Sequence, residues 1–278
     1  MGVNIEQQMI ELYCFVDEFF KTHPGWAQWR RSPHAQPQFS DAEVLTIALL
    51  QGVFEVAPLK QTYRLVAQNW WTAFPQLPSY KQGLMRVHQL LSQVGRLLIT
   101  TCTHPCPAAR LSLIDSKPLP LCQPIRHGRG RLLRNAGAYF GKSSKGGFFG
   151  FKLHLLRHID GRVLNIVLTP GNYDDRLPAL PLVQAVNGGI TLGDWGYRGP
   201  ACATALAEEA EMLLLTRDQA PAHRFVLSQV RPQVETPFSQ LWRKFVERVF
   251  SRSWTGLWNT LQLKVLYYNL RHAGVLSA

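Results

Sequence analysis

Two aspartates stand directly after short apolar segments that have the pattern of β-strands. Asp115 follows Leu111 to Ile114, and Asp194 follows Gly189 to Gly193 in the run Thr-Leu-Gly-Asp-Trp-Gly-Tyr. Functional carboxylates in an α/β sheet tend to lie at strand ends, where the backbone fixes them and adjoining loops leave room for a ligand. A carboxylate so close to a buried strand is costly unless it is paired, hydrogen-bonded or bound to a metal ion. Taken singly, each aspartate is equally well explained as a turn or cap residue.

A third carboxylate, Glu235, opens an amphipathic segment. Acidic residues are common at helix starts because the helix dipole favours them, so Glu235 alone has an ordinary structural explanation. Two strand-end aspartates and this glutamate would together offer oxygen ligands to a hard cation. Mg²⁺ is the predicted ion, with Mn²⁺ as a substitute, because it binds few carboxylates, keeps waters and shares phosphate oxygens. A pair of such ions would activate an attacking water or 3′-hydroxyl and stabilise the leaving oxygen of a phosphoryl transfer.

The charge pattern favours a substrate that carries phosphates. The chain of 278 residues has 30 Lys and Arg against 18 Asp and Glu, a formal net charge of +12, which favours a polyanionic partner. A solvated basic loop is the alternative for any one basic segment, but a long segment with no acidic residue favours phosphate contact. Such a basic strip lies between Ser116 and Ile159, where the sequence has no acidic residue and nine basic ones: Lys117, Arg126, Arg129, Arg131, Arg134, Lys142, Lys145, Lys152 and Arg157.

The elements that must position these residues begin with a helical part. Ser40 and Glu43 have the spacing of a capping box, which predicts a helix start at that point. A compact bundle of short N-terminal helices is equally compatible with a helix-turn-helix that reads DNA and with a packing or dimerisation module. We predict a helical domain over residues 1–105, with helices at 3–20, 40–52, 59–71 and from 79 onward.

From Arg110 the pattern changes to short apolar strands and then to alternating helices and strands. The order is the one expected of an RNase H-like domain, whereas periodicity alone leaves a generic α/β sheet. We predict a catalytic domain over residues 106–278, built on a mixed five-stranded sheet flanked by helices. Its strands are expected at 111–114, 148–156, 162–168, 190–192 and 211–215, and its helices at 177–186, 200–207, 237–251 and 255–269.

Two other classes of protein do not fit the sequence. No apolar run approaches the ~20 residues needed to cross a bilayer, and acidic residues interrupt the N-terminal segment. The five cysteines form an odd, scattered set, which argues against a secreted disulfide framework and for a reducing cytoplasm. We therefore expect a cytoplasmic, nucleoid-associated protein without a membrane partner.

Five short strings occur in order along the second part of the chain. They are Leu-Ile-Asp-Ser-Lys-Pro-Leu-Pro-Leu-Cys around Asp115, Gly-Phe-Lys-Leu-His from Gly150 to His154, Leu-Thr-Pro-Gly-Asn-Tyr-Asp-Asp from Leu168 to Asp175, Gly-Asp-Trp-Gly-Tyr around Asp194, and Val-Glu-Thr-Pro-Phe-Ser around Glu235. Each string is weak alone, but the ordered set resembles the DDE transposases of bacterial insertion sequences. The step of 41 positions from Asp194 to Glu235 (235 minus 194) fits the compact branch, which has no insertion in the catalytic domain.

This resemblance implies that Asp115, Asp194 and Glu235 bind the catalytic metal ions. It also implies an enzyme that cuts double-stranded DNA at the terminal inverted repeats and joins the 3′-hydroxyl to target DNA, acting as a homodimer on DNA. The family commonly has a basic residue where this chain has Trp195, so a phosphate contact is expected to be absent there. Two alternatives stay open: an RNase H-like nuclease without strand transfer, and a catalytically silent, transposase-derived DNA-binding protein.

Some further positions match the family less decisively. Asp175 is explained either as a site residue or as a helix cap, and His154 either as a site residue or as a satisfied strand histidine. Arg231, four residues before Glu235, could reach the active-site phosphate or only solvent. The predicted DNA contacts are therefore Lys117, Arg126, Arg129, Arg131, Arg134, Lys142, Lys145, Lys152, His154 and Arg231.

Overall fold

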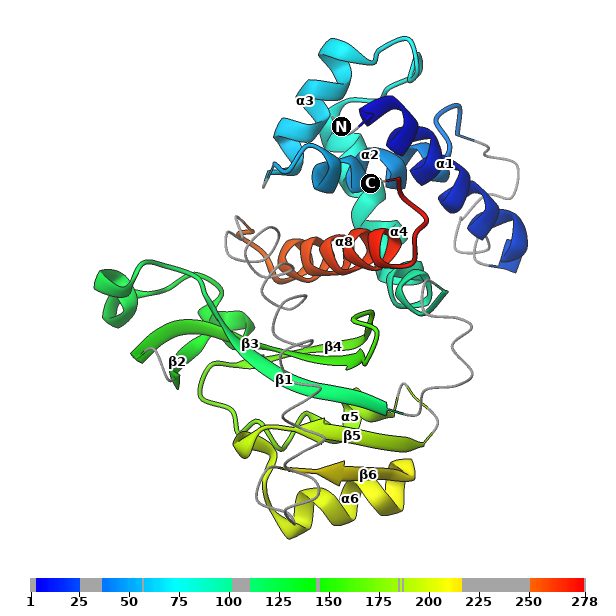
Figure 1. The fold of residues 1–278 in the computed structure, drawn as a ribbon. Coiled ribbons are helices and arrows are strands. Elements are labelled where there is room, and N and C mark those ends of the chain that lie inside the picture. Colours follow the sequence, from blue (N-terminus) through cyan, green and yellow to red (C-terminus); the bar gives the residue numbers. More distant parts are fainter. Residues whose placement is uncertain are drawn as a thin grey trace. The chain divides into compact units, whose positions relative to one another are not determined.

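The computed structural model describes residues 4–25, 37–56, 58–101, 111–143, 146–184, 186, 188–216 and 251–277. The chain divides into two compact units, which are described separately (Figure 1). One unit comprises Met1–Cys102 together with Lys244–Ala278, and the other comprises Thr103–Arg243. We refer to them as the helical unit and the sheet unit.

The helical unit contains the four predicted N-terminal helices and one more. These are α1 (Ile5–Thr22), α2 (Asp41–Val53), α3 (Leu59–Asn69), α4 (Tyr80–Thr101) and α8 (Trp254–His272). The capping box at the start of α2 is confirmed, because the Glu43 backbone N–H donates to Ser40 Oγ and the Ser40 N–H donates back to Glu43 Oε2. The helices expected at 3–20, 40–52, 59–71 and from 79 onward are thus present.

Helix α8 packs against α4 and α2 in the helical unit, whereas the sequence prediction assigned it to the catalytic domain. Two glycines permit this packing. A Cβ on Gly52 would lie 2.3 Å from the Tyr267 ring, and one on Gly95 would lie 2.7 Å from Gln262 Oε1. Close approach at these points requires glycine on α2 and α4. The difference arises because local periodicity shows that α8 has to be buried, but not against which partner.

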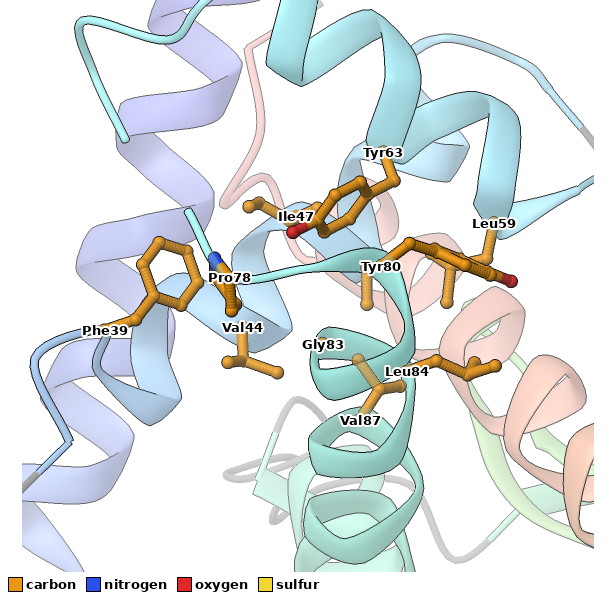
Figure 2. Close-up of a pocket in the computed structure, with 11 residues that line it drawn as sticks. Phe39, Val44, Ile47, Leu59, Tyr63, Pro78, Tyr80, Gly83, Leu84 and Val87 are labelled. Carbon is orange, nitrogen blue, oxygen red and sulfur yellow. The ribbon is translucent and has the colours of Figure 1, made fainter. Parts of the chain in front are cut away.

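The core between α2, α3 and α4 is apolar and almost fully packed. Figure 2 shows Tyr63 of α3 and Tyr80 of α4 beside Val44 and Ile47 of α2, and the two tyrosine rings meet edge to face at 5.7 Å. The cavity they border has a volume of about 10 Å³, room for one water at most. This space belongs to the helix packing and is too small for a ligand.

The sheet unit contains the predicted mixed sheet with one additional strand. Its strands are β1 (Leu111–Pro120), β2 (Tyr139–Ser143), β3 (Gly146–His158), β4 (Val163–Pro170), β5 (Gly189–Gly193) and β6 (Met212–Leu215). Strands β4, β3 and β1 are antiparallel neighbours, and β1, β5 and β6 follow in parallel. This is the RNase H-like arrangement predicted from the sequence. Short β2 pairs with the beginning of β3, ahead of β4.

Helices α5 (Ala179–Val183) and α6 (Pro200–Ala210) supply the buried core of one sheet face. Ile114 of β1, Leu156 of β3 and Leu214 of β6 pack with them, and Figure 1 shows α6 alongside β6. Leu113 and Leu192 form a smaller cluster. Because side chains alternate along a strand, Leu113 and Ile114 point to opposite faces of the sheet.

Two further findings complete the comparison with the predicted elements. The helix predicted over 237–251 lies outside the described residues. Among the helices that the structure does describe, none combines the length and the apolar character that crossing a membrane requires.

Candidate active site

The register between β1 and β5 brings the two predicted aspartates close together. Leu113 pairs with Leu192, and Ile114 pairs with Gly193. Asp115 is the next residue of β1, whereas Asp194 directly follows β5 and keeps an extended backbone at φ −81° and ψ −175°. The predicted strand end at Ile114 is corrected, because β1 continues to Pro120 and Asp115 pairs with Leu155 of β3. Alternation places both carboxylates on the sheet face that carries Leu113 and Leu192. Two parallel strands therefore present their aspartates side by side.

Local hydrogen bonds fix the orientation of each carboxylate. Asp115 Oδ1 accepts from the Ser116 backbone N–H at 2.8 Å. Asp194 caps the 3₁₀ turn Trp195–Tyr197, and its Oδ1 accepts from the Gly196 N–H at 2.9 Å. Each carboxylate thus has one oxygen oriented by a backbone N–H of the residues that follow it.

A third carboxylate, Asp175, approaches from the loop after β4. Its Oδ2 and Asp194 Oδ1 both lie 3.1 Å from the position that a Cβ on Gly196 would occupy. Gly196 therefore allows two acidic side chains to approach the same turn. Since like charges disfavour each other, this proximity requires compensating donors or cations.

Lys152 and Ser116 supply donors to Asp175. Lys152 Nζ lies 2.8 Å from Asp175 Oδ1, and it also donates to the Tyr173 carbonyl at 2.8 Å. Ser116 Oγ donates to Asp175 Oδ2 at 3.0 Å. Because Ser116 follows Asp115 in β1, this hydrogen bond joins the Asp175 loop to the strand that carries the first aspartate.

Tyr197 anchors the turn after Asp194 from below. Its side chain is fully buried, and its hydroxyl lies 3.3 Å from His154 Nδ1. His154 Nε2 in turn lies 2.8 Å from Thr169 Oγ1. A Cβ on Gly193 would come within 3.2 Å of Tyr197 Cβ, so glycine at this position allows the tyrosine to pack under the strand end.

The charges of the three aspartates act on the Tyr197 hydroxyl. The pKa of Tyr197 is raised well above its ordinary value, first by burial and then by the negative charges of Asp175, Asp115 and Asp194; a hydrogen bond with Ser116 acts in the opposite direction. The phenol consequently stays protonated and remains a hydrogen-bond donor. Burial also lowers the pKa of His154 to about 4, although the charge of Asp175 opposes that change. The imidazole is therefore neutral at physiological pH.

The described part of the site can supply two of the three predicted metal ligands. Asp115 and Asp194 offer the hard oxygen donors that Mg²⁺ prefers, and both are within electrostatic range of the Tyr197 hydroxyl. Among the described residues, no three His, Cys, Asp or Glu side chains form a group able to hold a metal ion. Glu235, Arg231 and Lys145 lie outside the described residues.

The structure divides the basic strip into an outer and an inner set. The outer set is solvent-exposed and comprises Arg126, Arg129, Arg131, Arg134 and Lys142. Arg126, Arg129 and Arg131 line an open hollow together with exposed Ile125 and Leu132, and we call these residues the arginine hollow. This set is accessible to a polyanion, as the charge pattern predicts.

The side chains of the inner set are buried or contact other residues of the protein. Arg157 and His154 are 3% and 0% exposed, and Lys152 is engaged with Asp175. The prediction that His154 contacts DNA is therefore corrected, because a strand histidine bound by Tyr197 and Thr169 has no surface to offer. Lys117 lies on β1 and is half-buried.

Sequence reasoning missed Ser116 and Thr169. Both are small polar residues in apolar strands, and each is adjacent or opposite to a residue that was identified: Ser116 follows Asp115, and Thr169 pairs with Lys152 across β3 and β4. A polar residue on the buried side of a strand was the available signal, since such a group requires a hydrogen-bond partner.

Comparison with known proteins gives a match to a family model and distant structural similarities. Residues 106–237 match a family model described as a transposase DDE domain. A piggyBac transposase synaptic complex with hairpin DNA has a TM-score of 0.45 at 10% identity, over 96% of this chain and 73% of the other. A Mos1 transposase paired-end complex with the left transposon end has a TM-score of 0.25 at 15% identity, over 87% and 84%. No curated protein sequence matches the chain.

Proposed function

We propose that the chain is a DNA transposase, because residues 106–237 match a transposase DDE domain, and that Asp115, Asp194 and Glu235 form its metal-binding triad. The observation that carries this proposal is the pairing of β1 with β5, which brings Asp115 within β1 next to Asp194 at the end of β5. Glu235 falls within the matched segment and supplies the third carboxylate.

Divalent metal ions are the general cofactors of DDE transposases, and we propose two Mg²⁺ ions here, replaceable by Mn²⁺. When bound, they supply the activation of the attacking oxygen and the stabilisation of the leaving oxygen. Asp115 and Asp194 would hold these ions through their carboxylate oxygens, which backbone hydrogen bonds from Ser116 and Gly196 orient. Tyr197, protonated and buried, supports the turn that aims Asp194.

Lys152, Ser116 and Asp175 are proposed as positioning residues. Lys152 compensates the charge of Asp175 where that carboxylate approaches Gly196. Ser116 ties the same carboxylate to β1 beside Asp115. These contacts keep the loop after β4 in one position relative to Asp115 in β1 and to Asp194 after β5. Alignment of the transition state requires such a fixed position.

We propose that the arginine hollow contacts the phosphates of double-stranded DNA, both the terminal inverted repeats of the element and the target. Arginine suits this role because its planar guanidinium can donate two hydrogen bonds to one phosphate. Exposed Arg134 and Lys142 extend the positive surface. Lys117 and Arg231, which are close in sequence to triad members, and Lys145 of the basic strip are proposed as further contacts.

The remaining features of the proposal come from the motif pattern. The strings around Asp115, Asp194 and Glu235 resemble the compact branch of bacterial insertion-sequence transposases. The resemblance also implies a homodimer on DNA. We propose in addition a helical domain over residues 1–105, which either contributes DNA contacts or serves packing or dimerisation, and a cytoplasmic, nucleoid-associated location, which the odd, scattered set of cysteines favours.

The proposal is tested by cleavage and strand transfer with the purified protein, Mg²⁺ or Mn²⁺, and labelled DNA carrying the ends that flank the gene. Asp115→Asn, Asp194→Asn and Glu235→Gln are each expected to abolish nicking while the protein still binds the ends. Nicking without joining would identify a nuclease, and binding without cutting by the wild-type protein would identify a silent derivative. Unchanged cleavage by any of the three variants would remove that residue from the triad.

A further inference from the structure

Trp195 is an exposed tryptophan directly beside a proposed metal ligand. It opens the 3₁₀ turn that Asp194 caps, and it is 57% exposed. Tryptophan buries more apolar surface than any other residue when packed, so an indole left in solvent forgoes a large stabilisation. The turn itself does not require the indole, because its anchors are the Asp194 cap and the buried Tyr197 ring.

The neighbouring Arg198 gives this indole a cationic partner. Its guanidinium carbon lies 5.1 Å from the centroid of the Trp195 ring, which is cation–π geometry. The contact limits the orientations available to the ring and places a positive charge beside it. An aromatic plane with an adjacent guanidinium is the combination that proteins use to hold an unpaired nucleotide, since the plane stacks on the base and the cation attracts the phosphate.

The position of the indole in the chain determines which base it can reach. Adjacent Cα atoms lie about 3.8 Å apart, so Trp195 is attached next to the residue that would bind the reacting phosphate. A side chain so close to the carboxylates reaches the nucleotide next to the scissile bond and not a distant one. Within an intact duplex that base is stacked on both sides, so it must leave the stack to contact the ring.

We propose that Trp195, oriented by Arg198, stacks on one unpaired base next to the scissile phosphate and holds the DNA strand end in the active site. This inference rests on the proposed transposase function and extends it to the conformation of the bound DNA. Trp195 is in this scheme a substrate-binding residue, and Arg198 is its positioning residue.

The test uses the DNA ends that flank the gene, with 2-aminopurine at successive positions on either side of the cleaved bond. Ca²⁺ replaces Mg²⁺ so that complexes form without cleavage. With the wild-type protein, one position is expected to be unpaired yet quenched, because the base leaves its neighbours and stacks on the indole. Trp195→Ala should make the same position bright, whereas Trp195→Phe should restore much of the quenching. Equal fluorescence at every position for wild-type protein and Trp195→Ala would overturn the proposal.

A second measurement separates stacking from damage to the turn. Trp195→Ala is expected to bind the intact end on the order of tenfold more weakly, the loss typical of one stacked base. An abasic site at the identified position should weaken wild-type binding by a similar factor and should leave Trp195→Ala almost unaffected. Trp71→Ala removes another exposed indole, 65% exposed in the helical unit, and should respond to the abasic site as the wild type does.

These outcomes are distinguishable from failure of the proposed function. If the wild-type protein shows no specific binding to the ends, the transposase assignment of this site is contradicted. Normal binding and Mg²⁺-dependent cleavage, with additive effects of Trp195→Ala and the abasic site, would retain the triad and reject the stacking role.

Discussion

Lys152 and Asp175 form an ion pair across the sheet unit, with Nζ 2.8 Å from Oδ1 and side chains only 16% and 21% exposed. Lys152 is on β3 and Asp175 is in the loop after β4, so the pair fixes that loop to the middle of the sheet. The loop brings Asp175 to the turn that Asp194 caps. The Lys152–Asp175 ion pair therefore determines where the Asp175 carboxylate lies relative to Asp194, a member of the proposed triad.

Replacing Lys152 by Met is expected to reduce single-turnover cleavage at least tenfold and to lower the free energy of unfolding by about 2 kcal/mol. The reason is that Asp175 would keep its charge in a partly buried position without its cation. Lys81→Met removes an exposed lysine of α4 to which no DNA contact is assigned, and it should change neither cleavage rate nor stability by comparable amounts. Full activity of Lys152→Met would show that the ion pair has no part in aligning the site.

Gly196→Ala is expected to abolish most cleavage while the fold persists. The added Cβ would sit 3.1 Å from both Asp175 Oδ2 and Asp194 Oδ1, so at least one carboxylate must move. Alignment of a catalytic group is sensitive to displacements well below 1 Å, and a loss of about 10²-fold is the expected scale. Gly128→Ala is the matched control, because nothing lies within 4 Å of a Cβ at that position. Circular dichroism and metal-dependent nicking measure fold and function separately.

The free energy of unfolding should fall as the pH is lowered from 6.5 to 4, and part of this fall should depend on His154. Burial lowers the pKa of His154 from 6.5 to about 4, so over this range the unfolded chain binds a proton that the folded chain does not. The neutral imidazole contributes stability that is fully present above pH 6.5 and is lost as pH falls, by up to about 3 kcal/mol. Urea denaturation of His154→Gln across the same range should show a correspondingly smaller slope. Parallel pH curves for the two proteins would contradict a neutral, buried His154.

Lys264 on α8 is expected to destabilise the helical unit at neutral pH. It is 6% exposed, and burial lowers its pKa from 10.5 to about 8. Below pH 8 the folded state holds a buried ammonium, and stability should rise as pH increases from 8 to 10.5 because the unfolded state then binds more protons. Lys264→Met should therefore raise the melting temperature at pH 7 and remove this dependence. Lys60→Met, at an exposed lysine of α3, serves as the control, and a decrease in melting temperature for Lys264→Met would refute the destabilising role.

The predictable parts of the structure were those with a local physical signal. The Ser40 and Glu43 capping pair located the start of α2, and five apolar runs located the strands of the RNase H-like sheet. Asp115 and Asp194 were proposed because a carboxylate beside a buried strand requires a partner; the strand end was predicted correctly for Asp194, whereas β1 continues past Asp115 to Pro120. Each of these inferences uses residues that are close in sequence.

The parts that escaped prediction depend on contacts between distant segments. Strand β2 has exposed Tyr139 and Phe140, so it lacks apolar alternation, and its position depends on Gly141 lying against Gly171, where a Cβ would be 2.0 Å from the Gly171 oxygen. Likewise, the charge of Lys152 predicts a phosphate contact until Asp175 is known to lie 2.8 Å away. The sequence shows which charge a side chain carries, whereas only the fold shows which partner it contacts.

The packing of α8 affects the order in which the two units can fold during synthesis. Residues of the sheet unit are translated before α8, yet α8 fills the space against α2 and α4. The sheet unit can therefore begin to fold on the ribosome while the earlier helices still await their last partner, since domains generally fold as units in the order of synthesis. Completion of the helical unit is therefore a late event, and a nascent chain that still lacks α8 would expose the surfaces of α2 and α4 that pack against it to chaperones and proteases.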